Sequence, residues 1–244
     1  MTIEEDTGRH AAAGTTVTGV ANAETLDMLL ATRFSCRAFT SQPVLDETIR
    51  AILSMAQRTA SWCNSQSWHL AITKGAGTER LRTALTNAAS QDIVEETDIP
   101  FPREYRGVHL SRRRESGFQL YNALDIQRSD IDRKREQAHQ NFRFFGAPHV
   151  AFIHTDEALG PYGAVDCGAY VSNFLLAATA FDVSTIAQAA LAVYPNIVRE
   201  QLELDSDRTI VCGISFGYAD PDHPANSYRT NRAEIDEVVD WIDR

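Results

Sequence analysis

The chain has 244 residues, of which 43% are hydrophobic and 23% are charged, and its formal net charge at pH 7 is −10. This composition is typical of a globular protein with a buried core. An acidic surface does not attract nucleic acid or anionic membranes, and no apolar run approaches the roughly 20 residues that a membrane-spanning helix needs. The N-terminal sequence also lacks the basic-then-apolar order of a secretion signal, so we expect a cytoplasmic protein.

The N-terminal part of the chain predicts a flexible polar tail over residues 1–22 and then a short helix over residues 24–32. A clearer amphipathic helix is expected at residues 46–58, where Asp46 is placed to cap the first turn. After a polar turn, the sequence WHLAIT (68–73) predicts a strand.

The middle of the chain predicts three helices and a loop. Thr78 is expected to cap the first of these helices, whose apolar face includes Leu81 and Leu85. Residues 92–106 contain two prolines and little periodicity, which indicates a loop. Residues 103–143 hold ten of the chain's 23 Lys and Arg residues against six acids, and two helices are expected there.

The second half of the chain predicts three strands and three helices. Residues 163–181 are apolar nearly all round, which is typical of a central buried helix. Asn231, with Glu234 three residues later, is expected to cap a last helix that ends at Trp241. The other elements are, in order, the strand PHVAFIHT, the strand VSTIA, the helix PNIVREQL and the strand RTIVCGISFGY. Helices outnumber a few strands in mixed order, without repeats or linkers, which indicates one α+β domain.

The four cysteines form no metal or disulfide pattern. They are Cys36, Cys63, Cys167 and Cys212, without a C-x-x-C pair or a histidine pair at ligand spacing. We therefore expect reduced thiols and no metal site.

The sequence GISFG (213–217) matches the elbow that exposes a serine nucleophile in hydrolases. That elbow needs a helix directly after Ser215, but YADPDHP follows, and the one later histidine, His223, is too close. The favoured interpretation is a buried strand with glycines where backbones pass closely. No phosphate-binding loop, dinucleotide fingerprint or H-E-x-x-H motif is present either.

Two arginine-rich stretches suggest an anion site. In RFSCRAF, Arg33 and Arg37 flank Ser35 behind a predicted helix, and in SYRTNR, Arg229 and Arg232 lie where the last helix is expected to begin. Free N–H groups at a helix start favour a bound phosphate. The alternative is a pair of solvated turns, and the sequence does not show whether the two stretches meet.

Two further stretches suit a planar ligand. In ASWCNSQSWH, the hydrogen-bonding side chains of Ser61, Asn64 and Gln66 lie among Trp62 and Trp68. Amides and a hydroxyl beside aromatic rings suit a heterocycle, although a capped turn with two core tryptophans would look the same. In IAQAAL (186–191), small side chains would let a flat ligand approach the backbone, but they also suit simple packing.

These four stretches together, from about residue 24 to the C-terminus, resemble the FMN-dependent nitroreductase family. RFSCRAF is similar to its R-x-S-x-R-x-F motif, ASWCNSQSWH to P-S-x-x-N-x-Q-P-W, IAQAAL to P-Q-A-A-L, and GYADPDHPANSYRTNR to a closing G-Y-x-D-P…N-x-[FY]-R-x-x-R segment. The resemblance implies an α+β sandwich with a central mixed or antiparallel sheet flanked by helices. It also implies an intertwined homodimer with FMN in two clefts between the subunits.

The resemblance also assigns site residues. Arg33, Phe34, Ser35 and Arg37 would hold the ribityl phosphate and the ring edge, helped by Arg229 and Arg232. Ser61 and Asn64 would reach the flavin of the partner subunit, while Gln66 would contact it or only brace the turn. Ala187, Gln188 and Ala189 would line the pyrimidine side of the ring, mostly with backbone groups.

The chain departs from the family pattern in its turns. Ala60, Ser67 and Ala187 stand where the family usually has proline, and Asp182 stands where it usually has glycine. None of these changes removes a polar group that would face the ligand, so they affect the rigidity of the turns rather than the cofactor assignment.

The resemblance implies a single domain over residues 23–244 with a variable helical lid around 100–143. The activity would be NAD(P)H-dependent reduction of small electron-poor compounds such as nitroaromatics, by ping-pong hydride transfer through flavin N5. Quinone reduction, reductive dehalogenation and non-catalytic flavin binding remain alternatives. Arg112, Arg113 and Arg114, expected at the start of the first lid helix, would meet the 2′-phosphate of NADPH or form a solvated face.

Overall fold

The computed structural model describes residues 17–91 and 93–243. The chain divides into two compact units, with the boundary between Thr32 and Arg33. Helix α1 (Val17–Thr32) is the described part of the first unit. Residues 17–22, expected in a flexible tail, are helical, although their sequence VTGVAN contains mostly residues of low helix propensity. The rest of the predicted tail, 1–16, lies outside the described residues.

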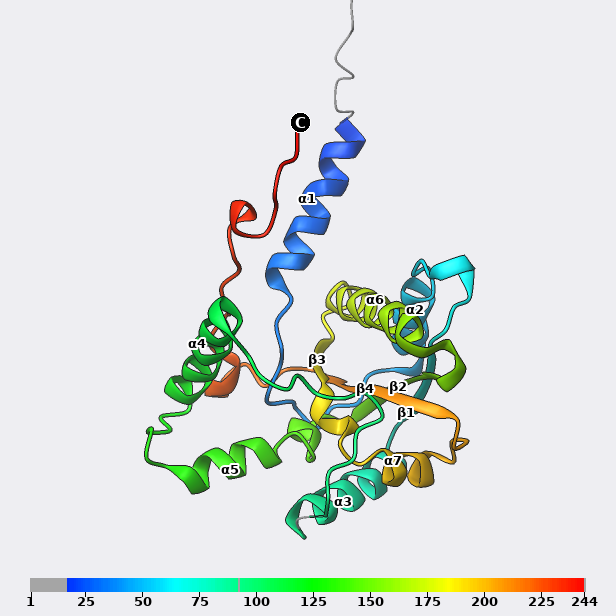
Figure 1. Cartoon of the computed structure of the whole chain (residues 1–244), viewed down its shortest axis with the longest axis vertical. Coiled ribbons are helices and arrows are strands. Elements are labelled where there is room, and N and C mark those ends of the chain that lie inside the picture. Colours follow the sequence, from blue (N-terminus) through cyan, green and yellow to red (C-terminus); the bar gives the residue numbers. More distant parts are fainter. Residues whose placement is uncertain (1–16, 92, 244) are drawn as a thin grey trace, which may run out of the picture. The chain divides into compact units, whose positions relative to one another are not determined.

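The second unit, from Arg33 onward, contains every other helix and strand (Figure 1). Short 3₁₀ turns connect several of them. The elements are α2 (Asp46–Ala56), β1 (His69–Thr73), α3 (Ala76–Ser90), α4 (Gly107–Ala123), α5 (Ile131–His139), β2 (His149–Asp156), α6 (Gly160–Thr179), β3 (Ser184–Gln188), α7 (Pro195–Leu202) and β4 (Arg208–Gly217).

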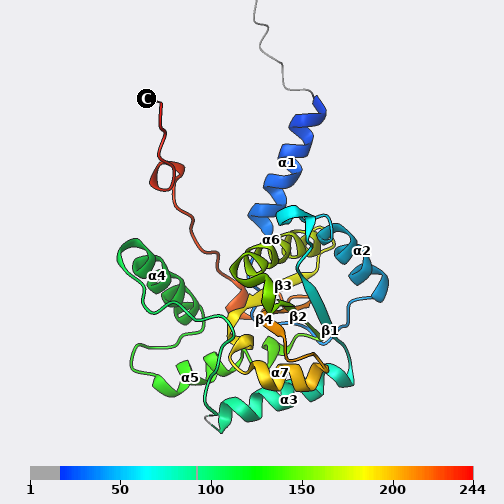
Figure 2. The same cartoon turned by 45° about the vertical axis from the view of Figure 1, so that its right-hand side comes forward.

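The four strands form one antiparallel sheet in the order β1-β2-β4-β3 (Figure 2). The α+β class and the antiparallel alternative of the predicted sheet are confirmed. Strand β3 lies at one edge, where it pairs with β4 from Ser184 opposite Gly217 to Gln188 opposite Gly213.

Helices cover both faces of the sheet, and each face has its own core. Figures 1 and 2 show α2 and α6 on one side and α3 and α7 on the other. Phe152 and Ile153 are neighbours on β2, so their side chains point to opposite faces. Ile153 packs in a cluster with Ile52 and Phe174, whereas Phe152 packs with Leu85. The resulting layers are helix, sheet and helix.

A bulge in β4 explains why its sequence does not alternate regularly. Ile153 is opposite Cys212, but His154 is opposite Ile210, so Val211 is an extra residue. One extra residue reverses which side chains face which side. Ile210 therefore belongs to the core under α3 and α7, although Ile214 belongs to the core under α2 and α6.

The predicted caps of α2 and α3 are wrong. The residue before α2 is Leu45, and Asp46 lies in the first turn, where it pairs with Lys74 at 2.6 Å. Helix α3 begins earlier than expected, after Gly75, whose φ of 53° starts the turn. Thr78 consequently lies inside the helix, and its hydroxyl donates to the Pro148 carbonyl at 3.1 Å.

The predicted C-terminal helix is also wrong. Only a 3₁₀ turn, Ile235–Glu237, forms there, and its capping box joins Glu234 to Glu237. Asn231 instead donates to the Glu115 side chain at 2.6 Å. A short helix gains most of its stability from packing, and the apolar residues of this segment are exposed, among them Trp241 at 76%.

The GISFG stretch is part of β4, which confirms the buried-strand interpretation. Ser215 is fully buried, and its hydroxyl donates to Gln188 at 2.5 Å, so it is not an exposed nucleophile. The glycines make room for side chains rather than backbone. A Cβ at Gly213 would lie 2.5 Å from Leu191, and one at Gly217 would lie 2.7 Å from Pro148.

The remaining predictions concern the basic segment, the thiols and bound metal. Residues 93–106 contain no helix or strand, and α4 and α5 are the two expected helices, although Arg112 lies well inside α4. All four cysteines are free thiols. Within residues 17–91 and 93–243, no helix is long and apolar enough to span a membrane, and no cluster of three or more potential ligands could hold a metal.

Candidate functional site

The RFSCRAF segment lies along the free edge of β3. Ser35 forms a parallel bridge with Thr185, and the Cys36 N–H donates to the Thr185 carbonyl at 3.0 Å. Two residues after Arg37, Phe39 bridges to Ala219 beyond the end of β4. The segment is therefore fixed by backbone pairing to strand β3 and to the residues that follow the last strand.

Asn226 joins this segment to the second arginine stretch. Its side-chain oxygen accepts from the Arg37 N–H at 2.8 Å, and its amide donates to the carbonyls of Ala38 and Asp220, each at 2.9 Å. The residue is 7% exposed. Sequence reasoning did not single out Asn226; the signal was its place in the closing motif, three residues before Arg229.

The two arginine stretches meet in the folded chain. The Arg229 guanidinium lies 3.9 Å from the centre of the Phe34 ring, and that of Arg37 lies 6.0 Å from the centre of the Tyr228 ring. Burial, and next the positive charge of Arg232, lower the pKa of the Arg33 guanidinium from its usual range. We call Arg33, Arg37, Arg229 and Arg232 the arginine cluster.

The arginine cluster has no internal counter-charge. Among the described residues, none of its four members forms an ion pair with a carboxylate. Arg37, Arg229 and Arg232 donate to nearby backbone carbonyls instead, at 2.8 to 3.3 Å. Guanidiniums without a carboxylate partner suit a phosphate, which accepts paired hydrogen bonds from them.

The predicted residues at the end of β3 divide between two roles. Ala187 and Ala189 are exposed, whereas Gln188 is 4% exposed. The Gln188 amide donates to the Asn141 carbonyl at 3.1 Å and accepts from Ser215. Its side chain therefore holds the scaffold together, and only the backbone and the two alanine side chains are presented outward.

The third predicted stretch, residues 61–67, forms a tight turn before β1, which we call the polar turn. Cys63, Asn64 and Gln66 adopt positive φ angles of 51°, 54° and 49°. The Ser61 hydroxyl accepts from the Gln66 N–H at 2.9 Å, and the Gln66 side chain accepts from Gln57, which directly follows α2, at 3.0 Å. These contacts favour the bracing role for Gln66.

The two tryptophans around the polar turn differ. Trp68 is 4% exposed and belongs to the core, whereas Trp62 is 56% exposed and contacts the ring edge of Tyr162, with centroids 4.3 Å apart. The interpretation of two core tryptophans is therefore wrong for Trp62. In the described part of the chain, no hydrogen bond or ion pair joins the polar turn to the arginine cluster.

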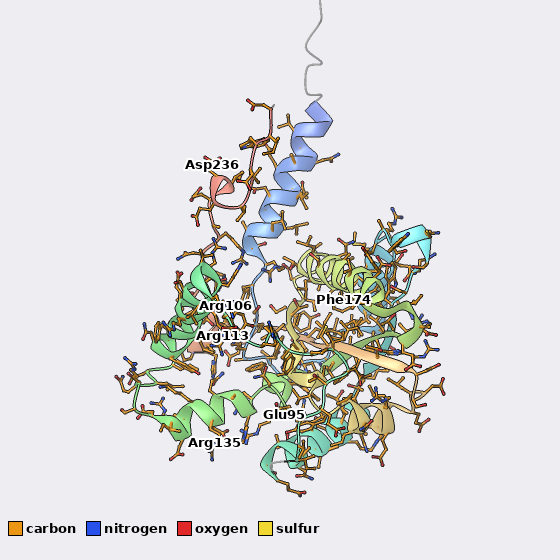
Figure 3. The ribbon with its side chains drawn as sticks, in the orientation of Figure 1. Glu95, Arg106, Arg113, Arg135, Phe174 and Asp236 are labelled. Carbon is orange, nitrogen blue, oxygen red and sulfur yellow. The ribbon has the colours of Figure 1, made fainter. Side chains whose placement is uncertain are left out.

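The basic segment is anchored to the C-terminal segment. Arg112 of α4 pairs with Glu237 at 3.1 Å, and these residues border a hollow of about 230 Å³ that Arg232 also lines. Arg113 lies 5.0 Å from the centre of the Tyr105 ring. Figure 3 shows Arg113 on α4 and Arg135 on α5. Two of the three α4 arginines thus have partners within the protein.

Comparison with known sequences settles the family. The profile of the Nitroreductase family matches residues 30–218. The chain belongs to the Nitroreductase family. The matched part of this nitroreductase contains the first two members of the arginine cluster and the polar turn, and it ends before Arg229 and Arg232.

The relatives agree over nearly the whole length of the chain. Nitroreductase NfnB of Mycolicibacterium smegmatis is 36% identical over 219 residues, which are 89% of this chain and 92% of the relative. The 4-nitrobenzoate reductase of a Nocardioides species is 33% identical over 227 residues, 90% of each chain. The crystal structure of the FMN-dependent nitroreductase NfnB from Mycobacterium smegmatis in complex with NADPH superposes with a TM-score of 0.87. That match has 34% identity and covers 91% of this chain and 99% of the other.

Proposed function

We propose that this protein is an FMN-dependent, NAD(P)H-using oxidoreductase that reduces nitroaromatic compounds. Relatives that match most of the chain are named as reductases of nitro compounds, and a similar solved structure contains NADPH and is described as FMN-dependent. The observation in this molecule that carries the proposal is the arginine cluster, because four arginines from two adjoining segments without a carboxylate partner suit an anion of high charge.

The residues present fit the phosphate end of FMN. Arg33 and Arg37, with Arg229 and Arg232, would hold the phosphate, and Ser35 would add a hydroxyl. The Tyr228 hydroxyl beside Arg37 is buried and has no hydrogen-bond partner among the described residues. A buried donor without a partner is rare in a folded protein and is consistent with a polar ligand at this place.

The residues around the proposed ring position are small or polar. Ala187 and Ala189 are exposed on the edge strand next to the segment that carries Ser35, so a flat ring could approach their backbone. Ser61 and Asn64 would reach the ring from the partner subunit, because their own chain places them on the side of α2 and α6.

In the reaction, the chain binds and orients. When bound, FMN supplies hydride transfer at N5, taking the hydride from NAD(P)H and giving it to the substrate. The arginine cluster neutralises the phosphate and so fixes the depth of the cofactor in the site. The reductant and the nitroaromatic compound would occupy the same place beside the ring in turn. This chemistry does not require a side-chain nucleophile.

The homodimer is part of the same proposal. Large apolar side chains are exposed at both ends of the described chain, including Leu26 and Met28 in α1, at 51% and 50%, and Val238 and Ile242 near the C-terminus, at 64% and 75%. Clusters of this kind mark surfaces that pair with another protein. The cytoplasmic location remains a prediction.

The test is a flavin titration followed by anaerobic reduction. FMN is added to protein prepared in a chloride buffer, NADPH is added without oxygen, and 4-nitrobenzoate follows. We expect the flavin absorption to disappear with NADPH and to return with the nitro compound. A protein that binds no FMN would overturn the proposal, and binding without reduction would show a flavin carrier. Return of the colour only with a quinone or a halophenol would select one of the alternative reactions.

A further inference from the structure

The polar turn has a conformation that its own residues do not favour. Three non-glycine residues, Cys63, Asn64 and Gln66, have positive φ angles. Asparagine tolerates this region, but cysteine and glutamine adopt it at a cost of about 1 kcal/mol each. A hollow of about 330 Å³ lies between the turn and the start of α6, and Trp62 and Cys63 line it together with Tyr162 and Asp166. A strained turn beside open space needs something that holds it.

The side chain of Asp166, in α6, fixes the polar turn through hydrogen bonds. Its carboxylate accepts from the Trp62 N–H at 3.2 and 3.3 Å and from the hydroxyls of Ser65 and Ser67 at 3.4 Å. The residue is 9% exposed, and within residues 17–91 and 93–243 no basic side chain pairs with it. All three donors belong to the polar turn, so the hydrogen bonds of this buried carboxylate go to that turn.

Ser67 adds a second contact between the polar turn and α6. Its side chain is 4% exposed and also lies 3.3 Å from the Gly163 carbonyl, one turn before Asp166 on α6. Proline usually stands at this position in the family that the sequence resembles. A proline ring would stiffen the turn covalently, whereas here one hydroxyl proton, within reach of both the Gly163 carbonyl and the Asp166 carboxylate, fastens it to a neighbouring helix.

We propose that Asp166 is a positioning residue for cofactor binding, which it serves by fixing the polar turn so that Ser61 and Asn64 face the flavin held by the partner subunit. This inference rests on the proposed function. Asp166 itself does not touch the cofactor. It determines the orientation of Ser61 and Asn64, which would contact the cofactor. The Ser67 hydroxyl belongs to the same set of contacts between the polar turn and α6.

The experiment compares Asp166→Ala, Asp166→Asn and Ser67→Ala by FMN titration and by hydrogen exchange of residues 60–68 in the FMN-free protein. Alanine removes all acceptors, and asparagine keeps one oxygen for the Trp62 N–H. We expect the dissociation constant for FMN to rise about tenfold in Asp166→Ala, because hydrogen bonds to a carboxylate are lost, and less in Asp166→Asn. Exchange at Trp62 and Gln66 should accelerate in the same order.

Asp98→Asn is the matched control. The Asp98 carboxylate also accepts a backbone N–H, that of Ile210 at 2.7 Å, and pairs with Arg199, but it lies on the α7 side of the sheet. This variant should lose thermal stability and keep the FMN affinity of the unaltered protein. If Asp98→Asn weakens FMN binding as much as Asp166→Asn does, the effect is general destabilisation and the proposal is wrong.

The outcomes separate this inference from the proposed function. Failure of the unaltered protein to bind FMN would overturn both. If the unaltered protein binds FMN and the Asp166 variants bind it equally well, only the positioning role is wrong. Faster exchange of the polar turn with unchanged FMN affinity would also overturn it, since the turn would then be held for a purpose other than the cofactor.

Discussion

The arginine cluster and the polar turn are two parts of one proposed site that are built in opposite ways. In the arginine cluster, backbone pairing to β3 and the buried amide of Asn226 hold four positive charges close together. In the polar turn, a buried carboxylate holds neutral groups in a strained backbone conformation. In the proposed site, the first region would bind through charge that the fold leaves unbalanced, and the second through the shape of the turn. Substitutions that remove charge should therefore weaken ligand binding most in the arginine cluster. Substitutions that remove hydrogen bonds to the backbone should weaken it most in the polar turn.

Removing one cluster charge should have the largest effect. Arg33→Ala is expected to raise the dissociation constant for FMN about 30-fold, which corresponds to about 2 kcal/mol for charge-assisted hydrogen bonds. Riboflavin, which lacks the phosphate, should bind equally to the variant and the unaltered protein. Arg80→Ala, an exposed arginine on α3, is the control and should change neither constant. Equal weakening of both ligands would mean that Arg33 does not contact the phosphate.

Removing the support of the cluster should have the next largest effect. Asn226→Ala deletes three hydrogen bonds of a buried side chain and is expected to lower the free energy of unfolding by about 2 to 3 kcal/mol. FMN affinity should fall about tenfold, because Arg37 loses its anchor. Urea denaturation and FMN titration measure the two effects. Loss of stability without loss of affinity would show that the cluster is held by β3 alone.

The thiols of the two regions should differ in reactivity. Burial raises the pKa of the Cys36 thiol to about 11, and Cys167 and Cys212 are likewise raised to about 11 and 12, whereas Cys63 in the polar turn is exposed. A thiol reagent at pH 8 should therefore modify Cys63 first, and FMN should slow that reaction severalfold. Cys63→Ser should abolish the fast phase. A fast phase that FMN leaves unchanged would place the polar turn away from the cofactor.

The smallest effect is expected from the basic segment. Arg112 and Arg113 have partners within the protein, which leaves Arg114 as the α4 arginine best able to meet the 2′-phosphate of NADPH. Arg114→Gln should lower the ratio of kcat/KM for NADPH to that for NADH about twofold, the size of an exposed charge interaction. Arg135→Gln on α5 is the control. An unaltered ratio would leave the solvated-face interpretation of α4.

The sequence was most informative where chemistry demands a residue type. Arginine suits a phosphate site because it binds the oxygens in pairs, so the cluster could be named from its residues. The alternation and periodicity of apolar residues located the four strands and most helices. That the two stretches meet depends on Asn226, whose side chain bridges distant segments without any local pattern. Asp166 was equally invisible, because an aspartate inside an apolar helix carries no sign of the turn that it supports.

The errors also have physical reasons. The last helix was predicted from a cap and apolar spacing, but a helix without a core to pack on does not gain enough stability to form. Gln188 was assigned to the ring by the family resemblance, mostly through its backbone, and its side chain connects β4 with the end of the basic segment through Ser215 and Asn141. The motif locates this residue at the end of β3, but it does not reveal that the side chain hydrogen-bonds within the protein.

The unbalanced charge of the arginine cluster has a practical consequence for handling the protein. Phosphate and sulfate ions compete for the same guanidiniums, so a preparation in phosphate buffer should melt at a higher temperature than one in chloride and should take up FMN less readily. High ionic strength should reduce both differences, because mobile ions screen partly exposed charges. Dissociation constants from different laboratories will therefore agree only when the anion composition of the buffer is matched.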